Sequence, residues 1–94
     1  MAVPMNPDFR KTLHFRLKEN HSFPTQYTFK FIVPSEQGKI DFIRQLFDHS
    51  SEVSLKQSAK KTFTSVTIRT EMESAEAIIK KYEAAAQVEG IISL

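Results

Sequence analysis

The chain has 94 residues, of which 40% are hydrophobic and 26% are charged, and it contains two glycines and four prolines. This composition is typical of one soluble globular domain and excludes low-complexity and fibrous architectures. The absence of cysteine excludes a disulfide framework, a thiol nucleophile and a zinc–thiolate site, and the net charge of +2 is too small to indicate a nucleic-acid-binding protein.

No targeting or membrane segment is recognisable in the sequence. The N-terminal residues lack the apolar core of a signal peptide, and no apolar run approaches the length that crosses a bilayer. We therefore expect a cytoplasmic protein with no membrane partner. Residues 1–7, which contain two prolines, are expected to be disordered.

Residues 8–22 are expected to form an N-terminal helix or arm. Asp8 is a suitable N-cap residue, and Phe9, Leu13 and Leu17 recur at a spacing of four on one helix face. We expect this docking stripe to pack either on the domain or on a partner.

The remaining residues, 23–94, alternate between strand and helix patterns. Alternating apolar and polar residues predict strands, and apolar residues three and four positions apart predict helices. The expected order is strand, helix, strand, strand, helix and strand, over residues 27–33, 36–48, 53–56, 62–70, 74–86 and 91–94.

With right-handed crossovers, this order favours a ferredoxin-like βαββαβ sandwich. We therefore expect an α+β fold with a four-stranded antiparallel sheet in the order 4-1-3-2, two helices on one face and an extra N-terminal helix. The other face of the sheet stays uncovered. The residues expected to face the helices are Phe29, Phe31, Val53, Leu55, Val66 and Ile68.

Three short motifs occur in the order of a known family pattern. They are HSFPTQYTFK at residues 21–30, QSAK at residues 57–60 and TSVTI at residues 64–68. Together they resemble the YbeD-like family of small bacterial proteins of unknown function, over residues 23–94. One departure lies in the hairpin, where Lys61 occupies the position of the family's usual glycine. The resemblance implies a ferredoxin-like fold related to the ACT regulatory domains and implies no catalytic residues.

The sequence offers no pattern for catalysis, metal binding or phosphate binding. His14, His21 and His49 lie apart from any nucleophile or carboxylate pattern and match no metal-binding spacing, which favours solvated surface residues. Gly38 and Gly90 are the only glycines, so a glycine-rich phosphate loop is excluded. We expect no enzyme, no metal and no cofactor.

RNA-recognition domains share this order of elements and stack bases on aromatic residues of their third strand. Residues 61–68 match that strand pattern at Lys61, Phe63 and Val66. Ser65 and Ile68 replace two of its aromatic residues and its glycine is missing, so most of the stacking surface is lost and nucleic acid is not an expected partner.

The uncovered sheet face is the main candidate site. We expect Lys30, Lys56 and Arg69 to lie there on neighbouring strands, as a row that awaits an acidic partner or an anion. The competing interpretation is a solvated face whose basic residues discourage edge aggregation. We infer a non-enzymatic regulatory or protein-interaction domain that presents this face and the docking stripe to an unidentified protein partner or to a second copy.

The alternative function is ACT-like sensing of an amino acid. Ser35, Gln37 and Gly38 follow the first strand, at the turn where the ACT domains bind their ligand. They form a candidate ligand turn, for which plain turn chemistry is the competing interpretation.

Overall fold

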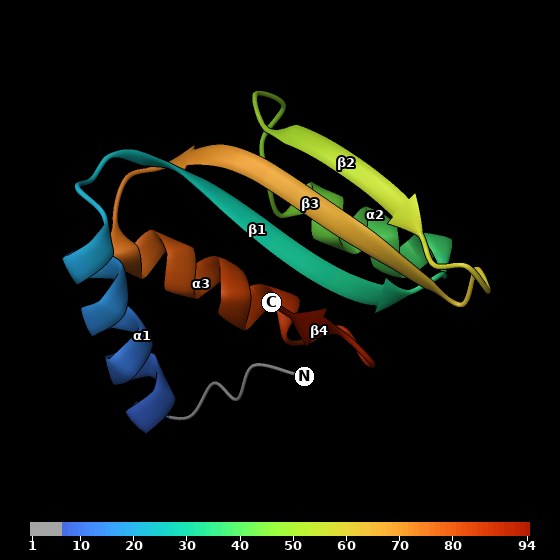
Figure 1. Ribbon diagram of the computed structural model, residues 1–94, viewed down its shortest axis with the longest axis horizontal. Coiled ribbons are helices and arrows are strands. Elements are labelled where there is room, and N and C mark those ends of the chain that lie inside the picture. Colours follow the sequence, from blue (N-terminus) through green and yellow to red (C-terminus); the bar gives the residue numbers. More distant parts are fainter. Residues whose placement is uncertain (1–6) are drawn as a thin grey trace.

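Four strands form one antiparallel sheet in the computed structural model, which describes residues 7–94 except the side chains of Pro7 and Phe9 (Figure 1). The expectation of disorder at the N-terminus concerns residues that lie outside the description, except Pro7, which begins a helix. The spatial order is β2-β3-β1-β4, which reads 4-1-3-2 from the opposite edge. The strands are β1 (Thr25–Pro34), β2 (Glu52–Gln57), β3 (Phe63–Met72) and β4 (Ile92–Ser93).

Three helices accompany the sheet in the described part of the chain: α1 (Pro7–Asn20), α2 (Gln37–Gln45) and α3 (Ala75–Ala85). Helices α2 and α3 lie along one face of the sheet, and α1 packs beside α3 (Figure 1). The α+β class and the four-stranded antiparallel sheet with one open face are therefore confirmed. The last strand is shorter than expected, because β4 has two residues.

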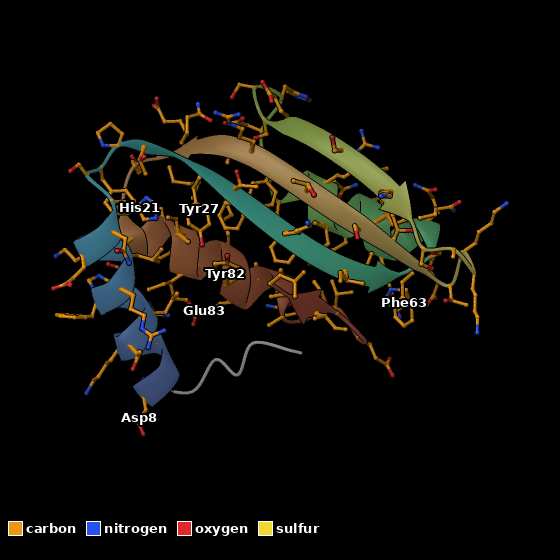
Figure 2. All side chains as sticks on the ribbon, in the orientation of Figure 1. Asp8, His21, Tyr27, Phe63, Tyr82 and Glu83 are labelled. Atoms are coloured by element: carbon orange, nitrogen blue, oxygen red, sulfur yellow. The ribbon has the colours of Figure 1, made fainter. Side chains whose placement is uncertain are left out.

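The core lies between the sheet and these two helices. Alternation buries every second residue of β1 and β3, and the apolar stripe of α3 packs against them. Tyr27 and Tyr82 point toward each other, and their hydroxyl oxygens are 2.8 Å apart (Figure 2). The side chains with no exposed surface include Phe29, Phe31, Val33, Ile43, Val66, Ile68, Ile78 and Ile79.

Strand β2 lies outside the cover that the helices provide. Val53 pairs with Ile68 and Leu55 with Val66, so both side chains lie on the helix side of the sheet. However, they are 36% and 47% exposed. The two residues therefore lie on the expected side of the sheet but are not buried, because the helices cover β1 and β3 and leave the edge strand bare.

The hairpin between β2 and β3 closes with an unusual backbone conformation. The Lys61 amide donates to the Ser58 carbonyl oxygen at 2.9 Å, and the Ser58 amide donates to the Phe63 carbonyl oxygen at 2.8 Å. Lys61 has a φ angle of 59°, in the left-handed region that favours glycine. The turn keeps a glycine-like conformation although a lysine occupies the position.

Local signals in the sequence explain where α3 begins and where the chain turns into β4. The Ser74 hydroxyl accepts a hydrogen bond from the Ala77 amide at 3.0 Å, which caps the helix. Gly90 has a φ angle of 83°, and a Cβ atom there would lie 2.9 Å from the Pro34 Cγ.

Within residues 7–94, no helix is both long enough and apolar enough to span a bilayer.

Candidate binding site on the open sheet face

The three predicted basic residues lie on the open face of the sheet, and all three are exposed. Lys30 is opposite Thr67, and Arg69 is opposite both Thr28 and Glu52. Lys56 is opposite Ser65. No two of these cations are opposite each other, so the expectation of a row of like charges is wrong. The register instead places hydroxyl-bearing residues between the cations.

Two of the three cations line a common hollow. Lys30 contributes from β1 and Lys56 from β2, whereas Arg69 is not part of its lining. The hollow measures about 640 Å³. Its other lining residues are Ile32, Ser54, Leu55, Gln57, Ser58, Phe63, Ser65 and Thr67.

The composition of this hollow determines what it can bind. Two ammonium groups and several hydroxyls donate hydrogen bonds to a carboxylate or a similar anion. Ile32 and Phe63 supply an apolar end, and Phe63 is 41% exposed. None of the lining residues is acidic. Arg69, in contrast, lies opposite Glu52 and two positions before Glu71 in β3.

The candidate ligand turn is held by contacts within the chain. The Ser35 hydroxyl is 2.8 Å from the Thr64 hydroxyl, and the Gln37 side-chain amide donates to Asp41 at 2.8 Å. Gly38 has no neighbouring atom within 4 Å of an added Cβ, so the space around it does not require a glycine. These contacts tie the turn to β3 and to α2, and amino-acid sensing by this turn stays a prediction.

The docking stripe of the N-terminal helix contacts the domain itself. Leu17 is 5% exposed and belongs to the core, and Leu13 packs against the core. Arg10 forms an ion pair with Glu83, and a second one with Glu76 at 3.8 Å. Phe9 lies in α1, but its side chain is outside the description. Of the two expected targets of the stripe, the structure shows the domain.

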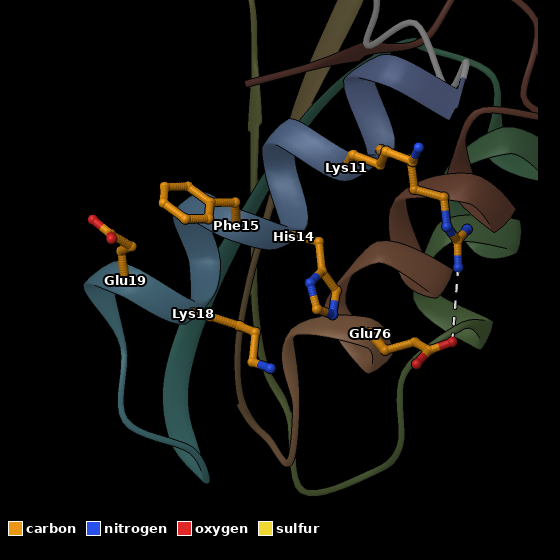
Figure 3. A pocket seen from close by; sticks show the side chains of 7 residues that line it. Lys11, His14, Phe15, Lys18, Glu19 and Glu76 are labelled. Atoms are coloured by element: carbon orange, nitrogen blue, oxygen red, sulfur yellow. Dashed lines mark ion pairs between the residues drawn. The ribbon is translucent and has the colours of Figure 1, made fainter.

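Sequence reasoning missed a second hollow, beside α1. It measures about 770 Å³, and its lining includes Lys11, His14, Lys18 and Glu76 (Figure 3). Phe15 lies on the side of α1 away from α3 and is 62% exposed. A signal was present in the sequence, because Phe15 falls outside the apolar stripe.

Two titratable side chains have shifted pKa values, and each makes a hydrogen bond to a neighbouring side chain. Among residues 7–94, no group of three or more His, Asp or Glu side chains is placed to hold a metal ion. Burial, and then the hydrogen bond with Tyr27, raises the pKa of Tyr82 well above its usual value. The Ser50 hydroxyl, which donates to Asp48 at 2.6 Å, is the main cause of a lowered pKa at that carboxyl. The Tyr82 shift thus arises mainly from burial in the core, and the Asp48 shift mainly from a local hydrogen bond.

Comparison with models of protein families identifies the family of this chain. A family model described as a protein of unknown function, DUF493, matches residues 18–94. The chain belongs to the DUF493 family. This is the YbeD-like family that the sequence motifs resemble. Neither the curated proteins nor the solved structures gave a match.

The limits of the DUF493 region separate the two hollows. The hollow on the open sheet face lies entirely within residues 18–94. Most residues that line the hollow beside α1 precede residue 18, outside the matched region. The open sheet face is therefore the candidate site that belongs to the family's domain.

Proposed function

We propose that this DUF493 domain is a non-enzymatic, regulatory protein-interaction module that binds an acidic segment of a partner on its open sheet face. We also infer that strands β1–β4 with α2 and α3 form a ferredoxin-like unit, in a bacterial cytoplasmic protein. The observation that carries the proposal is the hollow between Lys30 and Lys56, because its lining combines cations, hydroxyls and an apolar end without an acid.

The two faces of the sheet support this assignment. The helix side of β1 and β3 is filled by aromatic and aliphatic side chains of the core. The open side has strand-spaced cations at Lys30 and Lys56, separated by Thr67, Ser65 and Ser54. An extended peptide with alternating acidic and apolar residues matches this pattern, because its side chains also alternate.

The test is capture of a partner from native lysate by the immobilised protein. The doubly substituted variant Lys30→Glu/Lys56→Glu reverses both cations of the hollow. The matched control, Lys11→Glu/Lys80→Glu, makes the same change in net charge at exposed positions away from the face. We expect the wild type and the control to capture the same protein and the hollow variant to lose it. Retention by the hollow variant contradicts the proposal.

Salt and temperature provide the accompanying controls. Capture that depends on exposed charges weakens as salt shortens the range of electrostatic attraction. Thermal unfolding should be nearly the same for all three proteins, because the substituted side chains are exposed. A loss of capture together with a large fall in the melting temperature would indicate unfolding rather than a lost contact.

The alternative function, amino-acid sensing at Ser35, Gln37 and Gly38, is distinguished by thermal shift. A ligand at 100 times its dissociation constant adds about 2.7 kcal/mol to the free energy of unfolding. For a domain of this size, 1 kcal/mol raises the melting temperature by about 4–8 °C. A shift of this kind with one amino acid, abolished by Gln37→Ala, favours sensing over protein binding.

A further inference from the structure

The outer edge of β2 is a free sheet edge. β2 is the first strand in the order β2-β3-β1-β4, and in the described part of the chain no strand pairs with its outer side (Figure 1). All six residues of the strand are exposed. An edge of this kind presents a row of unpaired backbone groups to any strand that approaches it.

The alternating direction of backbone hydrogen bonds along β2 shows which backbone groups point outward. The Ser58 amide donates to Phe63 in β3, so the backbone of Ser58 points inward. Because this direction alternates along a strand, Ser54 also directs its amide and carbonyl toward β3. Val53 and Leu55 direct theirs toward the free edge. These are the groups that a second strand would pair with.

The sequence of β2 is self-complementary about Ser54. Val53 and Leu55 are its immediate neighbours, and both lie on the helix side of the sheet. Glu52 and Lys56 are the next residues, with opposite charges, and both lie on the open side. When such a segment pairs antiparallel with its own copy, each charge meets its opposite and each apolar side chain meets another.

We propose that two copies of this chain form a dimer in which their β2 strands pair antiparallel. The two-fold axis of the dimer passes through Ser54. The two four-stranded sheets then form one continuous eight-stranded sheet. Val53 lies opposite Leu55 of the second copy, in pairs that exchange backbone hydrogen bonds. Glu52 lies opposite Lys56 of the second copy. The symmetry makes each of these pairs occur twice.

Other registers are less favourable. Residues whose backbone points outward must pair with each other, so a change of register moves the two-fold axis by whole residues. The nearest alternatives place the axis at Leu55 or at Val53. With Leu55 at the centre, Glu52 lies opposite Ser58. With Val53 at the centre, Lys56 lies opposite Ser50. Both shifts lose the two opposite-charge pairs, each of which stabilises an antiparallel ladder.

This assembly goes beyond the proposed function and does not depend on it. A two-fold axis perpendicular to the sheet keeps both open faces on the same side, so the dimer presents two hollows on one surface. Ser54, Leu55 and Lys56 line the hollow and also take part in the proposed dimer contact, whereas Lys30 belongs to the hollow alone. The variants Ser54→Cys and Glu52→Lys leave both cations of the hollow intact, whereas the double charge swap also changes Lys56 and is therefore read for dimerisation alone.

The first experiment is a cysteine crosslink, which is direct because the natural chain contains no cysteine. At the two-fold axis, the two copies of residue 54 form a non-hydrogen-bonded pair with Cα atoms about 4.5 Å apart, within disulfide range. We expect Ser54→Cys to give a disulfide-linked dimer under mild oxidation. The control Ser58→Cys should not, because its two copies are eight strand positions apart, roughly 26 Å.

The second experiment is a charge swap, measured by sedimentation equilibrium. Glu52→Lys creates two like-charge pairs and should weaken dimerisation about tenfold. The double variant Glu52→Lys/Lys56→Glu restores both opposite-charge pairs and should recover the wild-type dissociation constant. Glu71→Lys is the control, because Glu71 is exposed on β3 away from the free edge.

Three results would overturn the proposed dimer. One is a wild-type chain that stays at its single-chain mass of 10.8 kDa up to millimolar concentration. Another is crosslinking of Ser58→Cys as fast as of Ser54→Cys. The third is a double charge swap that stays as weak as Glu52→Lys. Partner capture by Glu52→Lys is a separate readout, so failure of the dimer and failure of the proposed function are distinguishable.

Discussion

Lys30 and Phe31 are neighbours in β1, yet Lys30 is exposed and Phe31 has no exposed surface. Phe31 lies on the face that α2 and α3 cover, where its ring centroid is 6.0 Å from that of Phe29 and 5.9 Å from that of Tyr82. Lys30 lies on the uncovered face, opposite Thr67. The comparison shows that stability is concentrated on one face, which leaves the residues of the other available for binding.

The largest expected effect comes from breaking the covered face. Phe31→Ala leaves a cavity in a packed aromatic cluster and should lower the free energy of unfolding by about 4 kcal/mol. Lys30→Ala, one residue away, should change it by less than about 0.5 kcal/mol. Denaturant titration of both variants gives the two values. Similar losses would mean that the open face also contributes to stability.

A smaller effect should appear across the covered face itself. Val53 and Ile68 are register partners on the helix side, but Val53 is 36% exposed and Ile68 is fully buried. Ile68→Ala should cost about 3 kcal/mol. Val53→Ala should cost less than about 1 kcal/mol, because the edge strand lacks a helix above it. Measurement at low protein concentration keeps dimerisation out of the comparison, and equal losses would contradict this account of the uncovered edge.

Sequence patterns predicted which side of each strand a residue occupies but not how well that side is covered. The alternation of apolar and polar residues around Phe29 identified the buried face of β1, because the apolar or polar character of a residue indicates the face on which it lies. The same alternation placed Val53 and Leu55 on the helix side, and yet they are exposed. Coverage depends on where the helices lie across the sheet, and no local pattern in β2 contains that information.

The candidate site was predictable to the same extent. Alternation placed Lys30, Lys56 and Arg69 on the open face, and the structure has all three there. The grouping of Lys30 with Lys56, and the separation of Arg69 beside Glu52, depend on the register between strands. Likewise, the period of four identified the Leu13 and Leu17 stripe, but whether it packs on the domain or on a partner is a tertiary property.

The smallest expected effect is a gain in stability, at the hairpin that holds the bare edge strand. Lys61 has a φ angle of 59°. This conformation costs a non-glycine residue roughly 1–2 kcal/mol. A glycine avoids that cost but loses more backbone entropy on folding, about 0.5–1 kcal/mol. Lys61→Gly should therefore raise the free energy of unfolding by about 0.5–1 kcal/mol.

Thermal unfolding at low protein concentration measures this gain, and Lys60→Gly is the matched control. Lys60 is also an exposed lysine of the turn, but its φ angle is not positive, so a glycine there brings the entropy loss without the relief. Opposite signs for the two variants would show that the turn itself adopts the glycine-like conformation. If both variants destabilise, the left-handed conformation of Lys61 carries no cost that glycine can remove.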